Sequence, residues 1–568
     1  MTSNRCARVY APVMVAVLAA GACGGDRARP PSQAAAPVAS GVAQINPTPR
    51  DQVQDGGTFT WPIDAVPSNF NYGHLDGPNK DTSNVMSALM PSAFEADPTG
   101  APLWNPDYLA SEPTLTVGPP QVVTYAINPR AVWADGTPIT WEDFYWQWKA
   151  QNGSDTQYQI ASASGYEDIE DVQKGKDERE VIVTFKHSYA DWRAIFDPVY
   201  PATTNKDPKV FNEGWKERPL TTAGPFVLDS IDQTAKTITL VRNDKWWGNR
   251  ARLDAIMYRA IEPDAQIDAL ANGEIDATDV GPDANKFSRA KTIGNVEVRV
   301  AGGPNFRHVT VNGTGAILQD LRVRQALAMA IDREAIARAL LGPLDIDPQP
   351  LNNHIFMANQ AGYRDNAGAL GVYSPARARE LLDEAGWALN GSVRTKDGQP
   401  LEITAVIPAG VTTSRQETEL IQNMLAQVGI ALTIDTVPVG DFFSQYIVPG
   451  RFDLTVFSWM GTPYPISSSK SLYAKPIQNE EGGLDVKQNF ARVGSDEIDQ
   501  LFQQATQELD PSKATAIANR IDALIWQEVH SLTLYQRPEL VAVKRTLANF
   551  GAFGFATWRY ENIGWIEP

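Results

Sequence analysis

Apolar residues recur at two distinct periods along this chain, which predicts alternating strands and helices. The stretch LEITAVI over 401–407 alternates apolar and polar positions, as a half-buried strand does. In the helical segment that follows, Leu420 and Val428 fall on one face and form an apolar stripe. Two further strands are expected over 430–437 (IALTIDTV) and 452–457 (FDLTVF). This order predicts a βαβ unit, and therefore a domain with a parallel or mixed sheet.

Local signals place other elements along the chain. The folded body is expected to start near Gly56 with a strand, and Val122–Ile127 is a second strand candidate. Thr140 with Asp143 three residues later resembles a capping box at the start of a helix. Two helical stretches are expected within 321–340. The fold class is therefore α/β.

The first 55 residues have a different composition from the rest. Positive residues precede an apolar stretch that ends at Ala20, and Cys23 follows small residues. This pattern is typical of a bacterial lipoprotein signal, in which the cysteine thiol receives a diacylglyceryl group. We expect a signal peptide over 1–22, lipidation at Cys23 and a flexible tether over 23–55. An ordinary secretory signal with a chance cysteine is the alternative.

Composition narrows the classes of function. The chain has 568 residues, of which 43% are apolar, so it can form two or three domains with their own cores. A net charge of -18 disfavours nucleic acid and anionic lipid surfaces as partners. The only other cysteine, Cys6, lies in the predicted signal peptide, and the five histidines lack ligand spacing. We expect no metal site and no cofactor.

Motifs of catalysis are absent from the sequence. There is no phosphate loop, no nucleophile elbow and no H-E-x-x-H zinc motif, and GTGAIL at 313–318 lacks the third glycine of a dinucleotide fingerprint. The protein is therefore expected to have no catalytic residues and not to be an enzyme. An extracellular hydrolase is the remaining enzymatic alternative.

Aromatic and amide side chains gather instead in loop-like segments. The chain has 15 Trp and 17 Tyr, and several lie beside glycine, proline or asparagine. Examples are SNFNYGH at 68–74, LNNHIF at 351–356 and SWMGTPYP at 458–465. Aromatic walls next to exposed backbone suit a cleft that holds an extended polar ligand. The sequence thus favours a binding protein.

Several blocks of the chain resemble, in order, the landmarks of the peptide-type (family 5) solute-binding proteins of ABC importers. GGTFTWPIDAVPSNFN at 56–71 is similar to the family's first strand, and VWADGTPITWEDFYWQWK at 132–149 to its W-S-D-G-x-P block. The later blocks are AGPFVLDSIDQTAKTITLVRNDKWWG, NGEIDAT, DLRVRQALAMAIDREAI, YSPARARELLDEAGW and LTLYQRPELVAVKRTLANF. The resemblance runs from about Gly56 to Pro568 and is strongest to actinobacterial oligopeptide-binding lipoproteins.

This resemblance implies a bilobed clamp like that of the periplasmic binding proteins, with an extra subdomain on a discontinuous lobe. Lobe 1 would comprise 56–80, 195–303 and 530–568, the subdomain 81–194, and lobe 2 304–529. Ligand would bind between the lobes, which close by hinge motion, and the closed monomer would dock on the permease subunits of an importer.

The resemblance also implies a site. Peptide binders of the family anchor the ligand's α-ammonium on the acid of a G-W-x-x-D segment, and here SWMGT at 458–462 puts Thr462 in its place. Either another acid, such as Asp64 or Asp76, replaces it, or the ligand has no ammonium there. Trp459 would form an aromatic wall, and Tyr464 a side-chain pocket. The full set of expected ligand-binding residues is Trp459, Gly461, Thr462, Tyr464, Asn71, Asn353 and His354.

The leading hypothesis is a lipid-anchored protein on the outer side of the cell membrane, on its periplasmic or cell-wall side. It would capture oligopeptides or peptide-like solutes and deliver them to an ABC importer. A carbohydrate or glycolipid binder on the same fold is the first alternative, because tryptophan stacking and neutral amides suit sugars. A structural or regulatory lipoprotein that transports nothing is the second.

Overall fold

The computed structural model describes residues 43–478 and 483–567. The predicted signal peptide over 1–22, Cys23 and residues 23–42 of the predicted tether lie outside this part of the chain. Gln44 and Ala552 exchange two backbone hydrogen bonds, of 2.9 and 3.0 Å, and the Gln54 N–H donates to the Trp565 carbonyl. Residues 44–54 are therefore bound to the C-terminal segment, which shortens the stretch that can act as a tether.

Lobe 1 contains a four-stranded sheet whose strands come from distant parts of the sequence. Strand β1 (Thr58–Ile63) pairs in parallel with β10 (Ala255–Ala260), and the antiparallel strands β9 (Thr237–Arg242) and β8 (Phe226–Asp232) complete the order β1-β10-β9-β8. Because β1 closes against a strand almost two hundred residues later, the lobe is discontinuous in sequence.

The subdomain contributes a second sheet, which is entirely antiparallel and has the order β4-β5-β7-β6. The strand expected over 122–127 is β5, and helix α2 begins directly after Thr140. The capping box of Thr140 and Asp143 is present, which confirms that prediction. The elements are β4 (Thr114–Thr116), β5 (Gln121–Ala126), α2 (Trp141–Gln151), β6 (Ile169–Lys174) and β7 (Glu180–Phe185). The shorter elements of lobe 1 and the subdomain are α1 (Lys80–Met86), β2 (Phe94–Ala96), β3 (Pro102–Trp104), α3 (Ala202–Asn205) and α4 (Pro208–Glu213).

A mixed six-stranded sheet of order β11-β21-β12-β18-β16-β17 takes strands both from the segment predicted as lobe 2 (304–529) and from segments predicted for lobe 1. The core packed against it is called that of lobe 2. Strands β16 (Glu402–Pro408) and β17 (Ala431–Val437) pair in parallel and are joined by helix α10 (Thr412–Ala426), which confirms the predicted βαβ unit. Strand β18 (Leu454–Met460) continues the sheet beside β16. Val428 is buried in the core of this lobe, and Leu420 packs against it.

Helices α7 to α10 pack against this sheet, and α7 and α8 are the two stretches expected within 321–340. Asp332 caps the second of these by accepting a hydrogen bond from the Ala335 N–H. Helices α12, α13 and α14 pack mainly on one another in a separate cluster. In residues 43–478 and 483–567, no helix is both long and apolar enough to cross a membrane. The helices are α5 (Gln266–Ala271), α6 (Ala284–Lys291), α7 (Leu321–Ala330), α8 (Arg333–Leu341), α9 (Pro375–Glu384), α11 (Val439–Asp441), α12 (Pro465–Tyr473), α13 (Asp496–Gln507) and α14 (Pro511–Glu528). The remaining strands are β11 (Ala277–Asp279), β13 (Ala388–Asn390), β14 (Val393–Lys396), β15 (Gln399–Pro400), β19 (Ile477–Gln478), β20 (Leu484–Asp485), β22 (Leu547–Ala548) and β23 (Gly564–Trp565).

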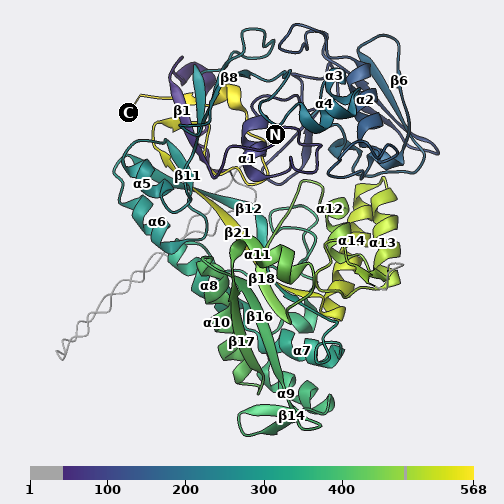
Figure 1. The fold of residues 1–568 in the computed structure, drawn as a ribbon, viewed down its shortest axis with the longest axis vertical. Coiled ribbons are helices and arrows are strands. Elements are labelled where there is room, and N and C mark those ends of the chain that lie inside the picture. Colours follow the sequence, from purple (N-terminus) through teal and green to yellow (C-terminus); the bar gives the residue numbers. More distant parts are fainter. Residues whose placement is uncertain (1–42, 479–482, 568) are drawn as a thin grey trace, which may run out of the picture. The chain divides into compact units, whose positions relative to one another are not determined.

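Two long strands, β12 (Val296–Val311) and β21 (Ser531–Lys544), run antiparallel to each other and connect the lobes (Figure 1). Alternate residues of β21 belong to different cores: Val541 and Val543 lie in the core of lobe 1, whereas Leu540 and Ala542 lie in that of lobe 2. The lobe boundaries expected at 303/304 and 529/530 fall within or next to these strands. The lobes are thus joined by a shared pair of strands.

Candidate ligand-binding site

The segment that follows β18 is bound closely to the connection between the lobes. The Gly461 N–H donates to the Pro304 carbonyl at 2.7 Å. A Cβ atom at position 461 would lie 2.6 Å from that same carbonyl oxygen. Backbone approach this close requires a glycine, so Gly461 fixes the path of the chain toward Thr462.

Trp459 is packed among aromatic side chains. Its ring stacks on Phe490 with centroids 5.6 Å apart and on His308 at 5.9 Å, and it meets Phe457 edge-on at 5.1 Å. The residue is half-buried. These contacts make Trp459 a fixed support for the segment after β18, with only part of its surface left for a ligand.

The polar atoms of Thr462 are engaged by neighbouring residues of its own segment and by Gln360. Its hydroxyl lies 3.0 Å from the Ser468 hydroxyl and accepts a hydrogen bond from the Tyr464 N–H, and its carbonyl accepts one from Gln360 Nε2 at 2.9 Å. The position carries no charge. It organises the turn that leads into helix α12.

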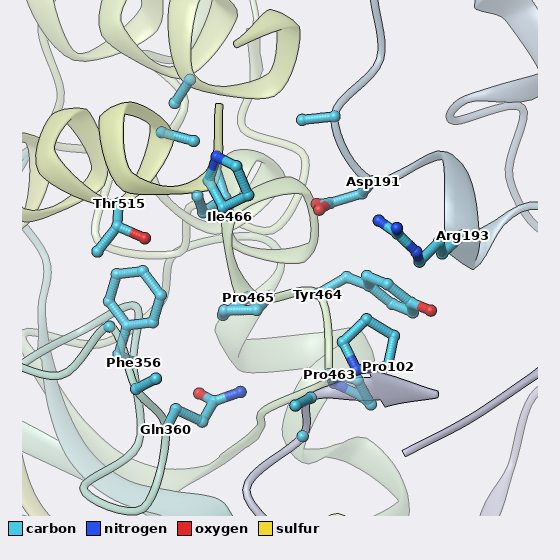
Figure 2. A pocket seen from close by; sticks show the side chains of 18 of the residues that line it. Pro102, Asp191, Arg193, Phe356, Gln360, Pro463, Tyr464, Pro465, Ile466 and Thr515 are labelled. Atoms are coloured by element: carbon cyan, nitrogen blue, oxygen red, sulfur yellow. The ribbon is translucent and has the colours of Figure 1, made fainter. Parts of the chain in front are cut away.

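Tyr464 lines a cavity of about 410 Å³ between the subdomain and lobe 2 (Figure 2). A cavity of this size can hold a small molecule or part of a peptide. Asp191 and Arg193 enter it from the subdomain, whereas Gln360 and Phe356 enter it from lobe 2. Its lining comes from 99–102, Leu115, 190–193, 356, 360–362, 463–466, 505, 508–509, 511 and 514–515.

The subdomain and lobe 2 are in contact beside this cavity. The Ala190 N–H donates to the Thr506 carbonyl at 2.7 Å, and the Ser467 N–H donates to Asp191 Oδ2 at 3.2 Å. Burial raises the pKa of the Asp191 carboxyl, and the hydrogen bonds from Ser467 oppose that shift. Burial, with the nearby charges of Asp197 and Asp191, raises the pKa of Tyr464 far above its ordinary value, so its hydroxyl stays protonated.

Three of the expected ligand contacts are instead internal parts of the fold. Asn71 donates to the Phe211 carbonyl and accepts from the Gly73 N–H, and Asn353 Oδ1 accepts from the N–H groups of Ile355 and Phe356. His354 Nδ1 lies 2.7 Å from Asp522 Oδ1, and its Nε2 lies 3.1 Å from the Ser531 carbonyl. All three are buried, and none lines the cavity, because their polar atoms complete turns and pairs inside the two lobes.

The two acids considered as replacements at position 462 do not reach the cavity either. Asp64 is exposed and accepts a hydrogen bond from Gln266 Nε2, and the Asp76 side chain is 56% exposed beside His74. Sequence reasoning missed Asp191 and Arg193, which lie in the stretch YADWRAIF, and no motif there marks them.

A second group of charged side chains lies where the connecting strands meet lobe 1. Lys80 Nζ pairs with Asp279 Oδ2 at 3.1 Å, and the Arg537 guanidinium lies close to the backbone of Gly281. Glu539, on β21, accepts hydrogen bonds from the N–H groups of Phe553 and Gly554. Burial raises the pKa of Glu539 from its ordinary 4.5 to about 7.

Replacing Glu539 by glutamine should reduce the pH dependence of stability. Because its pKa is higher in the folded than in the unfolded state, its contribution is full below pH 4.5 and is lost as the pH rises through 7. Between pH 4.5 and pH 7 we expect the unfolding free energy of the wild-type protein to fall by about 1 kcal/mol more than that of the Glu539→Gln variant. Urea titrations on either side of this range measure the difference. Equal losses in the two proteins would contradict the assignment.

Two lobes joined by a strand pair, with a cavity between the subdomain and lobe 2, define the class of solute-binding proteins. The model of the bacterial extracellular solute-binding proteins, family 5, matches residues 109–479. The chain belongs to this family, which confirms the family resemblance and the bilobed α/β fold predicted from the sequence.

Known relatives match over most of the chain. The oligopeptide-binding protein OppA of Mycobacterium tuberculosis is 42% identical over 530 residues, which cover 93% of this chain and 88% of the relative. A probable monoacyl phosphatidylinositol tetramannoside-binding protein of the same species, LpqW, is 26% identical over 69% of this chain and 66% of its own length. Among solved structures, the periplasmic EDTA-binding protein EppA superposes with a TM-score of 0.84 at 25% identity, covering 93% of this chain and 99% of that structure.

Proposed function

We propose that this protein captures oligopeptides on the outer side of the cell membrane and delivers them to an ABC importer. The observation that carries the proposal is 42% identity to an oligopeptide-binding protein across 93% of the chain. The cavity between the subdomain and lobe 2 supports it, because a ligand there touches both sides and favours the closed arrangement over an open one. Binding, without chemical change of the ligand, is the activity that this site supports.

The residues proposed to serve the ligand are those around the end of β18. Gly461 and Thr462 fix the path of the backbone that leads to Tyr464, whose ring lines the cavity. Trp459 packs against Phe490 and holds the start of this segment in place. Lipidation at Cys23 would hold the protein at the membrane, in line with the extracellular description of the family. The protein is proposed to act as a monomer that docks on permease subunits.

A glycolipid or other amine-free ligand is the second candidate. It is favoured by the likeness to LpqW and by the absence of an acid at position 462. A peptide and a glycolipid differ in mass and in their amino groups, so one measurement separates them.

Native mass spectrometry of the full-length protein, purified in detergent and then denatured to release bound species, tests the proposal. We expect a set of short peptides to copurify, and saturable binding when the emptied protein is titrated with synthetic peptides of defined length. A copurifying sugar-containing species, together with no heat of binding for any peptide, would replace the peptide function with the glycolipid one. A structural protein would show neither.

A further inference from the structure

Asp191 is a carboxylate without a cationic partner inside the cavity. It forms no ion pair within residues 43–478 and 483–567, and its hydrogen bonds come from Ser467. A mostly buried carboxylate without a countercharge is unfavourable, which is reflected in its raised pKa. A positively charged group in the cavity would relieve this cost.

Arg193 presents the opposite charge to the same cavity. Its guanidinium carbon lies 4.2 Å from the centre of the Trp192 ring, and it forms no ion pair or hydrogen bond with any residue that the structure describes. Figure 2 shows it between Asp191 and Tyr464. Asp191 and Arg193 are not paired with each other either, so both remain available to a ligand.

Asp191 is distinguished from the other acid that lines the cavity by its closeness to Tyr464, whose pKa it raises. Of the described residues that line the cavity, Glu508 is the second acid, and its carboxylate accepts a hydrogen bond from the Asp510 N–H. Asp191 has a further neighbour suited to a cation, because the Tyr464 ring lines the same cavity and aromatic faces attract ammonium groups. The cavity therefore combines an acid, an aromatic ring and an unpaired guanidinium.

We propose that this cavity binds the first residue of a peptide, with its α-ammonium on Asp191 and its first carbonyl oxygen on Arg193. The inference rests on the proposed peptide-binding function and assigns the charged end of the ligand to the subdomain side of the site. Thr462 then needs no charge, because the acid is supplied from across the cavity. The ligand class is a peptide with a free amino terminus.

The contact of Asp191 with Ser467 suggests an alternative role for this carboxylate, which is to hold the subdomain against lobe 2. Asp191 also joins the subdomain to the first turn of helix α12, so its loss could weaken closure for every ligand alike. A comparison between two ligands that differ only at the amino group isolates the ammonium contact from closure.

The experiment is isothermal titration of the full-length protein with one peptide in two forms, free and N-acetylated. We expect the wild type to prefer the free form at least tenfold, and Asp191→Asn to bind both forms within about twofold. Asp168→Asn is the matched control, since it makes the same change in the same subdomain at a residue that does not line this cavity. It should keep the wild-type preference. Arg193→Met should weaken both forms by a similar factor.

The possible results of these titrations distinguish the ammonium site from the peptide-binding function on which it rests. A wild type that binds both forms equally would overturn the ammonium site and leave peptide binding intact. Equal weakening of both forms by Asp191→Asn, with the wild-type preference preserved, would make Asp191 a closure contact and also overturn it. A wild type that binds neither form would overturn the peptide function itself. Thermal melts of each variant identify any that fails to fold, and Arg193→Met then tests the same cavity.

Discussion

Replacing Glu417 by alanine should lower the unfolding free energy by about 3–5 kcal/mol, because it leaves a buried arginine without its partner. Glu417, on α10, is fully buried and forms an ion pair with Arg307 of β12, which is 5% exposed. The Tyr535 hydroxyl donates to Glu417 Oε1 at 2.6 Å, and Arg307 Nη2 donates to the Ser414 hydroxyl at 2.9 Å. The carboxylate thus ties a helix to the two connecting strands. Urea denaturation measures the loss.

An exposed pair provides the control for this prediction. Glu334 and Arg338 form an ion pair of 2.8 Å on the surface of α8, with both side chains more than half exposed. Glu334→Ala should change the unfolding free energy by about 0.5 kcal/mol or less, because solvent screens such a pair. If Glu417→Ala were no more destabilising than Glu334→Ala, the buried pair would not have the role assigned to it.

Adding a single methyl group at Gly303 should destabilise the protein by about 1–3 kcal/mol. A Cβ atom there would lie 2.5 Å from the Arg537 carbonyl oxygen and 3.1 Å from the Glu539 nitrogen, both on β21. Since these are backbone atoms, the strands themselves must move apart where they connect the lobes. We therefore expect Gly303→Ala also to weaken ligand binding. Urea denaturation and titration with a peptide ligand measure the two effects.

Gly294 is the matched control, because a Cβ atom at that position would meet nothing within 4 Å. Gly294→Ala should change stability by about 0.5 kcal/mol or less and should leave binding unaltered. Indistinguishable results for the two alanine variants would mean that the connecting strands absorb the methyl group without moving, contrary to the expectation.

The elements that sequence patterns predicted well are those whose causes are local. The βαβ unit at 402–437 follows from alternation and helical periodicity within a single stretch, and the capping box of Thr140 and Asp143 from side chains three residues apart. The pairing of β1 with β10 was beyond such patterns, because it depends on segments almost two hundred residues apart. Side chains close together in sequence determine where a helix or strand forms, whereas packing between distant segments determines which strands pair.

The site was predicted less well for a related reason. An amide-rich loop has the same composition whether it faces a ligand or closes a buried turn, and at Asn71 and Asn353 it does the latter. Of the predicted residues Tyr464 lines the cavity and stays a prediction for the site, whereas Asp191 and Arg193, which also line it, were not identified at all. The cavity forms from several segments spread from 99 to 515, so no single stretch of sequence carries its signature.

The place of β21 in the central sheet has a consequence for how the two lobes fold. This strand lies between β11 and β12 in the central sheet and contributes residues to the cores of both lobes. Neither core can close without residues 531–544, so the two lobes depend on the same strand and are expected to fold together rather than one after the other.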